Sequence, residues 1–191
     1  MINLKKGIFI VISGPSGVGK TTICNKLSKL DNIWYSVSVT TRKKRANEKE
    51  GIQYYFTDVV SFKEKIECGE FFEYSIYDGN YYGTLKSTVT SKLDKGISVI
   101  SEIDVAGAKN IKKLYEKAIL IYIHPPSYAE LENRLLKRGT EDKEKIRRRI
   151  EMATLEINNL EGYDYELINY DIDKTIDEII NILNSLDGKI N

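Results

Sequence analysis

The 191-residue sequence is poor in several features, and each shortage narrows what the protein can be. Two cysteines, Cys24 and Cys68, are too few for a disulfide framework, which fits a reducing, cytoplasmic setting. No apolar run approaches the length that spans a membrane, and the N-terminal run Ile8–Ile12 is better explained as a core strand than as a signal peptide. A formal net charge of +1 gives no general attraction to nucleic acid or anionic membranes, so we expect neither as a partner.

Histidine is also scarce. The only one, His124, stands directly before Pro125 and Pro126, at the end of an expected strand. No neighbouring residues complete a catalytic triad or a metal-binding set around it. We therefore expect a structural role for His124.

The rest of the composition is that of an ordinary globular protein, with 41% apolar and 30% charged residues. Apolar runs suited to strands alternate with amphipathic stretches suited to helices. This rhythm predicts an α/β fold, in which a parallel five-stranded sheet carries helices on both faces and binds ligands at the carboxyl ends of its strands. The expected strands are 8–12, 33–39, 97–103, 118–123 and 166–169, and the expected helices include 86–94, 106–117, one after Ser127, 141–160 and 174–186.

A glycine-rich loop follows the first strand and is the strongest motif of the chain. Gly14, Gly19, Lys20 and Thr21 match the phosphate-binding pattern G-x4-G-K-[ST], with a strand before it and an amphipathic helix after it. The glycines let backbone N–H groups turn toward phosphate oxygens, and the helix adds the positive end of its dipole. Lys20 is suited to the β- and γ-phosphates and the Thr21 hydroxyl to Mg²⁺. The predicted ATP-binding residues of the loop are Gly14, Pro15, Ser16, Gly17, Val18, Gly19, Lys20, Thr21 and Thr22.

The segment 52–84 interrupts the strand–helix rhythm with dense aromatic residues and short β-like pieces. We expect a small α+β insertion with mixed or antiparallel strands. Within it, Ser61 and Glu64 have the spacing of a capping box, and Gly69 marks the end of the same short helix.

Two polar clusters point to a second ligand beside the phosphate loop. Arg42 and Arg45 follow a hydroxyl-rich strand end and suit a phosphate, although a solvated basic loop explains the same residues. Glu73 offers a carboxylate to the paired donors of guanine, although aromatic packing beside exposed glutamates is the simpler explanation of that stretch. Glu102 and Asp104 stand at the end of an apolar strand, where a carboxylate that orients Mg²⁺ is placed beside a phosphate loop. The alternative is that either acid contacts the acceptor nucleotide.

Arginines gather near the C-terminal third of the chain, at Arg134, Arg138 and 147–149. Guanidinium groups carried by a closing segment stabilise the charge that spreads over a phosphoryl group in transfer. A basic, solvent-facing helix surface is the alternative explanation.

Taken together, these stretches resemble the guanylate kinase family along nearly the whole chain. The shared motifs are 13–20 (SGPSGVGK), 36–38 (SVS), 40–42 (TTR) with Arg45, 79–83 (GNYYG), 102–104 (EID) and 138–140 (RGT). The resemblance implies transfer of the γ-phosphoryl group of ATP to GMP, giving ADP and GDP, with Mg²⁺. It also implies a P-loop core of about 1–35, 86–130 and 160–191, a GMP-binding insertion of about 36–85 and a lid of about 134–155.

The resemblance also assigns individual residues. The implied catalytic residues are Lys20, Arg42, Arg138 and Arg149, the implied metal ligand is Thr21, and Asn169 falls on an adenine contact. The implied GMP-binding residues are Ser38, Arg42, Arg45, Tyr54, Glu73, Tyr82, Thr84, Glu102 and Asp104. Lys44 stands where the family usually has proline, which predicts a looser loop between Arg42 and Arg45.

Other functions fit the sequence less well. A non-catalytic interaction module of the same family typically has a degraded phosphate loop, whereas this chain keeps Lys20. A kinase for AMP or dTMP does not explain Glu73. A GTPase would need an N-K-x-D motif, which the helix sequence Asn25–Ser28 does not match at its last position. We expect a monomer or a homodimer.

Overall fold

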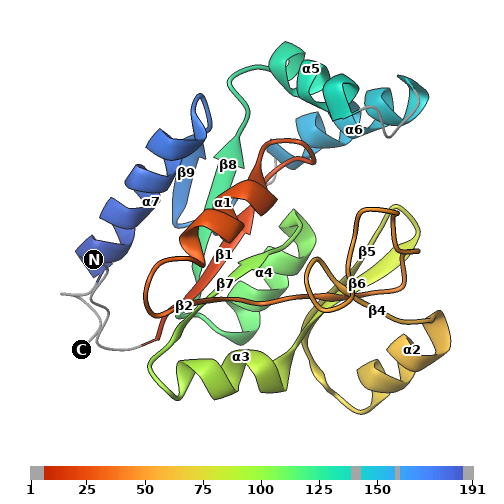
Figure 1. Cartoon of the computed structure of the whole chain (residues 1–191), viewed down its shortest axis with the longest axis vertical. Helices are drawn as coiled ribbons and strands as arrows, with labels where there is room; N and C mark the ends of the chain where they lie inside the picture. Colours follow the sequence, from red (N-terminus) through yellow and green to blue (C-terminus); the bar gives the residue numbers. More distant parts are fainter. Residues whose placement is uncertain (1–6, 139–142, 158–159, 187–191) are drawn as a thin grey trace.

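The computed structural model describes residues 7–138, 143–157 and 160–186 and is built on a central parallel sheet (Figure 1). The five strands lie in the order β2-β7-β1-β8-β9, and every adjacent pair is parallel. This architecture confirms the predicted α/β class. The strands are β1 (Phe9–Ser13), β2 (Ile33–Tyr35), β7 (Ser98–Glu102), β8 (Ile119–His124) and β9 (Tyr165–Ile168).

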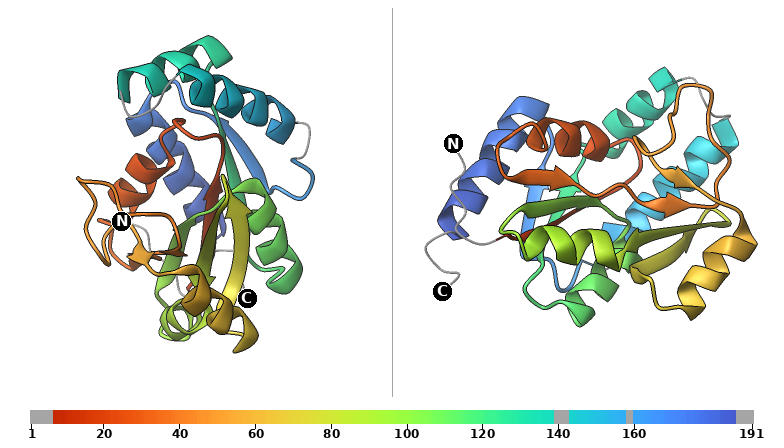
Figure 2. Two further views of the ribbon diagram at one scale, coloured as in Figure 1. Left: turned by 90° about the vertical axis from the view of Figure 1, so that its right-hand side faces the viewer. Right: turned by 60° about the horizontal axis from the view of Figure 1, so that its bottom comes forward.

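Helices cover both faces of this sheet, because its strands are apolar on both sides. Along β1, Ile10 and Ile12 enter a core shared with α1 (Lys20–Leu27) and α7 (Ile172–Leu186). Their neighbours Phe9 and Val11 enter a second core under α3 (Lys86–Leu93) and α4 (Val105–Leu114). The right-hand view of Figure 2 shows these two helix pairs on opposite sides of the strands.

The strand order places a binding crevice at one edge of the sheet. The chain leaves β1 toward β2 on one side and later crosses from β7 to β8 on the other, so the connections diverge at β1. Such a switch point opens a crevice at the carboxyl ends of the strands. The phosphate loop follows β1 there, and Glu102 ends the neighbouring β7.

A second, four-stranded sheet with mixed strand directions lies beside the carboxyl ends of the central strands, as the aromatic segment predicted. Its order is β4-β3-β6-β5, with β3 parallel to β4 and antiparallel to β6. Phe62 of α2 stacks on Phe71 at 4.3 Å between ring centroids and, with Val39, forms a small separate core. The elements are β3 (Val39–Thr40), β4 (Tyr55–Phe56), α2 (Val59–Glu67), β5 (Phe71–Tyr77) and β6 (Asn80–Leu85).

Two details differ from the sequence-based expectations. The expected strand 33–39 is divided, because β2 ends at Tyr35 in the central sheet and β3 begins at Val39 in the second sheet. The capping box at Ser61 is wrong: Asp58 caps α2, and its Oδ1 accepts the Ser61 N–H at 2.9 Å. The strand was misjudged because an apolar run indicates burial but not which strand is the partner. The cap was misplaced because Asp58 and Ser61 have the same three-residue spacing as Ser61 and Glu64, and the helix starts at the earlier pair.

Two further helices lie together at the top of Figure 1, α5 (Tyr128–Arg138) and α6 (Lys143–Ile157). Ser127 caps α5, because its Oγ accepts the Glu130 N–H at 3.1 Å. Leu131 and Leu135 join the larger core and anchor α5 to the rest of the molecule. Within the described part of the chain, no helix has the length and apolar character needed to cross a bilayer.

The small core of the second sheet gives a stability prediction. Phe62 is fully buried, so Phe62→Ala should lower the free energy of unfolding by about 3–5 kcal/mol through lost contacts and a cavity. Val60→Ala, an exposed position on the same helix, should change it by less than about 0.5 kcal/mol. Urea denaturation measures both, and equal effects would contradict this description of the core.

Candidate active site

The phosphate loop takes its shape from glycines that have no room for a side chain. Gly14 has φ +142°, and a Cβ there would lie 2.4 Å from the Ile123 carbonyl oxygen. Gly19 has φ +110° and would place a Cβ 2.8 Å from Asn169 Nδ2. Both angles lie in the region that other residues rarely adopt. The loop therefore folds tightly between β1 and α1, whose N-terminus opens toward the crevice.

Lys20, the first residue of α1, extends back along the loop. Its ammonium group donates hydrogen bonds to the carbonyl oxygens of Gly14 at 2.6 Å and Pro15 at 3.1 Å. These contacts hold a positive charge beside the loop's backbone amides, in the position where a phosphate chain needs one.

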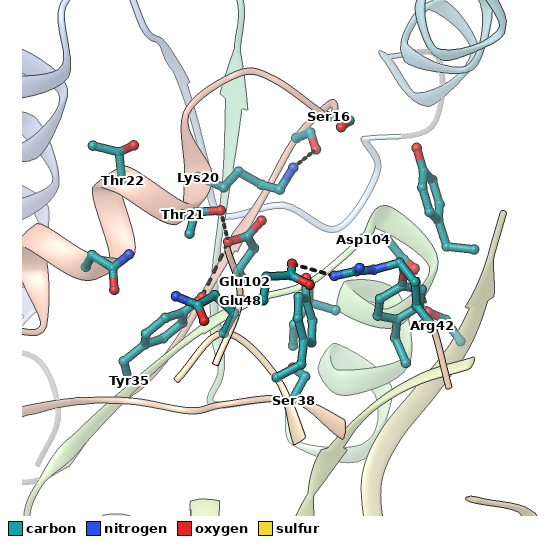
Figure 3. Close-up of a pocket in the computed structure, with 18 of the residues that line it drawn as sticks. Ser16, Lys20, Thr21, Thr22, Tyr35, Ser38, Arg42, Glu48, Glu102 and Asp104 are labelled. Atoms are coloured by element: carbon teal, nitrogen blue, oxygen red, sulfur yellow. Dashed lines mark hydrogen bonds and ion pairs between the residues drawn. The ribbon is translucent and has the colours of Figure 1, made fainter. Parts of the chain in front are cut away.

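Thr21 connects the loop to the end of β7. Its hydroxyl donates to Glu102 Oε2 at 2.7 Å, and the Tyr35 hydroxyl reaches the same oxygen at 3.4 Å (Figure 3). Burial, followed by the nearby Glu102 charge, raises the pKa of Tyr35 far above its ordinary value, so Tyr35 stays a neutral donor. Hydroxyl and carboxylate oxygens are the ligands that Mg²⁺ prefers, and Thr21 and Glu102 fit that ion.

A cavity of about 530 Å³ lies between the phosphate loop, the end of the central sheet and the second sheet. Most of the predicted site residues line it, from segments far apart in the sequence. They are Gly14, Ser16, Lys20, Thr21, Thr22, Ser38, Arg42, Arg45, Tyr54, Glu73, Tyr82, Glu102, Asp104 and Arg149. The expected donor and acceptor sites therefore share one pocket.

Arg42 is held on the second-sheet side of this cavity. Its NH2 group donates to Glu48 Oε1 at 2.7 Å, and the guanidinium carbon lies 5.3 Å from the centre of the Tyr54 ring. Tyr82 packs edge-on against Tyr54, with 5.8 Å between ring centroids. A guanidinium group and two phenols are thus gathered at one end of the pocket, a set of donors suited to a phosphate group.

Glu73, at the buried end of the pocket, is only 6% exposed. Oε1 accepts from the Thr84 hydroxyl at 3.0 Å, whereas Oε2 is buried and has no hydrogen-bond partner among the residues that the structure describes. Burial raises the pKa of Glu73 to about 8; the nearby Asp104 adds to the rise, and the Thr84 bond opposes it. Gly107 makes room for the carboxyl group, since a Cβ there would lie 2.5 Å from Oε2. Thr84 is fully buried behind Glu73 and does not line the cavity.

Asp104 reaches the pocket but uses both carboxylate oxygens within the protein. Oδ1 caps α4 by accepting the Gly107 N–H at 2.7 Å, and Oδ2 accepts from the Ser75 hydroxyl at 2.5 Å. Asp104 thereby links the central sheet to β5 of the second sheet. With both oxygens engaged in this way, Asp104 is suited to holding the wall of the pocket in position.

Three other predicted residues lie around the phosphate loop. Arg149 of α6 donates a hydrogen bond to the Ser16 hydroxyl, which brings the predicted lid onto the loop. Asn169 is buried behind the loop, where its amide donates to the Val18 carbonyl at 2.7 Å and accepts from Thr175. The side chain of Arg138, together with Gly139 and Thr140, lies outside the described residues.

Sequence reasoning missed several residues that line this pocket. Glu48 belongs to a basic loop, and Tyr35 ends a short strand, so neither carries a motif of its own. Ser75 and Glu156 come from β5 and α6, and only the folded chain brings them to the phosphate loop. The one available signal was an acid three residues after Arg45 in a stretch rich in lysine and arginine.

A phosphate loop at the switch point of a parallel sheet, facing a second cluster of phosphate donors, defines a P-loop phosphotransferase that acts on nucleotides. Comparison with known proteins makes this specific. Residues 6–186 match the family model described as guanylate kinase. The chain belongs to the guanylate kinase family.

Individual relatives agree along almost the full length. The chain is 46% identical to a guanylate kinase of Clostridium tetani over 95% of this chain and 88% of the relative. It is 45% identical to one of Prochlorococcus marinus subsp. pastoris over 97% and 100%. A crystal structure of guanylate kinase from Anaplasma phagocytophilum is 38% identical, with a TM-score of 0.81, covering 98% of this chain and 89% of the other.

The raised pKa of Glu73 predicts a pH-dependent stability. The unfolded chain releases this proton near pH 4.5, but the folded protein keeps it up to about pH 8. Between these values the folded state binds more protons, so the contribution of Glu73 to stability falls as the pH rises. Glu73→Gln should therefore be more stable than the unsubstituted protein, by a margin that grows from pH 5 to pH 8 in thermal unfolding. A margin that stays constant would contradict burial of an ionisable Glu73.

Proposed function

We propose that this pocket transfers the γ-phosphoryl group of ATP to GMP, giving ADP and GDP. Members of the guanylate kinase family are nucleoside monophosphate kinases with this activity, and the chain belongs to that family. The observation that carries the assignment to this pocket is that Lys20, Arg42 and Glu73 line one cavity. In our proposal, a donor-phosphate site, an acceptor-phosphate site and a base-reading carboxylate thus face one another.

The acceptor end of the pocket supports GMP through its own chemistry. We assign the GMP phosphate to Arg42, Arg45, Tyr54 and Tyr82, with Ser38 beside them. Guanine presents N1–H and an exocyclic amine side by side, and Glu73 Oε2 is a buried acceptor without a partner in the described part of the chain. Two such donors would stabilise the ionised carboxylate, which burial alone disfavours. Thr84 orients Glu73 from behind, and Asp104 holds the adjoining wall.

Transfer itself requires positioning and charge more than proton chemistry, because the acceptor is a phosphate oxygen. Lys20 and the loop amides bind the phosphates of ATP, and Arg149 approaches them from α6. We keep Arg138 in the same role, on the family motif alone, and Asn169 as a predicted adenine contact. Closure of α5 and α6 over the pocket would exclude water and limit hydrolysis of ATP.

Thr21 and Glu102 would hold Mg²⁺, directly or through water. When bound, the ion neutralises charge on the β- and γ-phosphates. The hydroxyl-to-carboxylate contact at 2.7 Å shows that both oxygens already converge beside the loop. Tyr35 shares the Glu102 oxygen and keeps it oriented.

The substrate assignment is tested with a panel of nucleoside monophosphates in a coupled ADP-release assay. GMP should be strongly preferred over AMP and dTMP. Glu73→Gln should raise the KM for GMP by roughly 10- to 100-fold, because the amide sets a donor against a guanine donor. Glu70→Gln, an exposed neighbour paired with Lys65, should leave the GMP kinetics unchanged. Unchanged GMP kinetics in both variants would overturn the base-reading assignment.

The metal assignment is tested at Thr21. Thr21→Ser keeps the hydroxyl and should keep the Mg²⁺ dependence, whereas Thr21→Val removes it at similar volume. The valine variant should need roughly tenfold more Mg²⁺ for half-maximal rate, with a lower maximum. A magnesium titration of the initial rate measures this shift. If the two variants respond alike, Thr21 is not a metal ligand.

A further inference from the structure

Glu48 is an acid in the middle of a basic loop, and it meets Arg42 directly in the pocket. The carboxylate and the Arg42 guanidinium lie 2.7 Å apart, with side chains only 12% and 16% exposed. Figure 3 shows Glu48 pointing at Arg42 across the cavity. Such partial burial keeps water from replacing either partner fully, so this pair restrains Arg42 more than a surface ion pair would.

Both oxygens of the Glu48 carboxylate are used, and they join two parts of the loop. Oε1 accepts from Arg42, while Oε2 accepts the backbone N–H of Arg45 at 2.8 Å. The Glu48 N–H donates in return to the Arg45 carbonyl at 3.1 Å. One side chain therefore sets the distance between Arg42 and the backbone of Arg45.

Arg42 is restrained from its other sides as well. Its NH1 group donates to the Lys43 carbonyl at 2.8 Å, and its guanidinium lies over the rings of Tyr54 and Phe56. Burial alone would raise the pKa of Glu48, but the hydrogen bonds from Arg42 and Arg45 outweigh it and lower the pKa. Glu48 thus remains charged at neutral pH.

We propose that Glu48 is a positioning residue for GMP, acting as a brace that holds Arg42 and Arg45 in the spacing that a single phosphate group requires. The inference rests on the proposed GMP site. A bidentate arginine contact needs its planar group in a fixed orientation, and the brace supplies that orientation before the substrate arrives.

A purely electrostatic role for Glu48 predicts the opposite effect. Removing a negative charge beside two guanidinium groups should strengthen the binding of an anion, and so lower the KM for GMP. A brace predicts weaker binding of GMP. Without the Glu48 carboxylate, the Arg42 side chain regains its rotamer freedom and the loop loses the two hydrogen bonds that Glu48 accepts. The sign of the change in KM therefore separates the two roles.

Three variants of the full chain test the brace in steady-state assays with GMP and ATP varied separately. Glu48→Gln keeps the shape but sets an amide donor against one of its two partners. Glu48→Asp keeps the charge but is too short to reach both. Both should raise the KM for GMP about tenfold and leave kcat within threefold and the KM for ATP unchanged. Glu50→Gln is the matched control, since that exposed acid accepts the Phe56 N–H and does not line the pocket.

A double substitution tests whether the effect passes through Arg42. Arg42→Ala alone should raise the KM for GMP strongly, and adding Glu48→Gln to it should cost less than about threefold more. An unchanged or lowered KM in Glu48→Gln, an unaffected Glu48→Asp, or a full tenfold cost in the Arg42→Ala background would overturn the brace. If Arg42→Ala itself leaves the KM for GMP unchanged, the proposed GMP site is wrong instead.

Discussion

The tight backbone turn between β1 and α1 is the constraint on which the rest of the site depends. Gly14 and Gly19 adopt angles that require glycine, and the neighbouring Ile123 and Asn169 leave no space for a side chain. This turn brings backbone amides and the start of α1 to one point at the edge of a parallel sheet. Lys20 and Thr21 are placed by it, because they are the first two residues of the helix that it begins.

The side of the pocket that Arg42, Glu73 and Asp104 line is organised around charged side chains that are held in place by hydrogen bonds within the protein. Arg42 is fixed by Glu48, and Asp104 is fixed by the helix it caps and by Ser75. Glu73 is the exception, since one of its oxygens is buried and finds no partner within residues 7–138, 143–157 and 160–186. Such a group costs stability in the folded protein. Its cost is understandable where a ligand completes the hydrogen bonding, and this links the stability of the protein to its proposed recognition of guanine.

Much of the fold could be predicted because its signals are local or periodic. The runs 8–12 and 118–123 are apolar on every residue, as parallel strands covered on both faces must be. The phosphate loop is a contiguous motif, and the spacing of its glycines and of Lys20 predicts the shape of its backbone. The division of 33–39 between two sheets and the capping of α2 by Asp58 could not be predicted, because both depend on which partner a backbone group finds.

By itself, the sequence determined the α/β class, the phosphate loop and the family. The first two depend on residues that are neighbours in the chain, and the third depends on the order of short motifs. It also marked most of the residues that line the pocket. Only the tertiary structure decided which of them meet: Glu48 with Arg42, Thr84 with Glu73, and Tyr35 with Glu102. The physical reason is distance along the chain. Thr21 and Glu102 are 81 residues apart in the sequence. They meet because β1, which leads into the phosphate loop and α1, pairs with β7, and Glu102 ends β7.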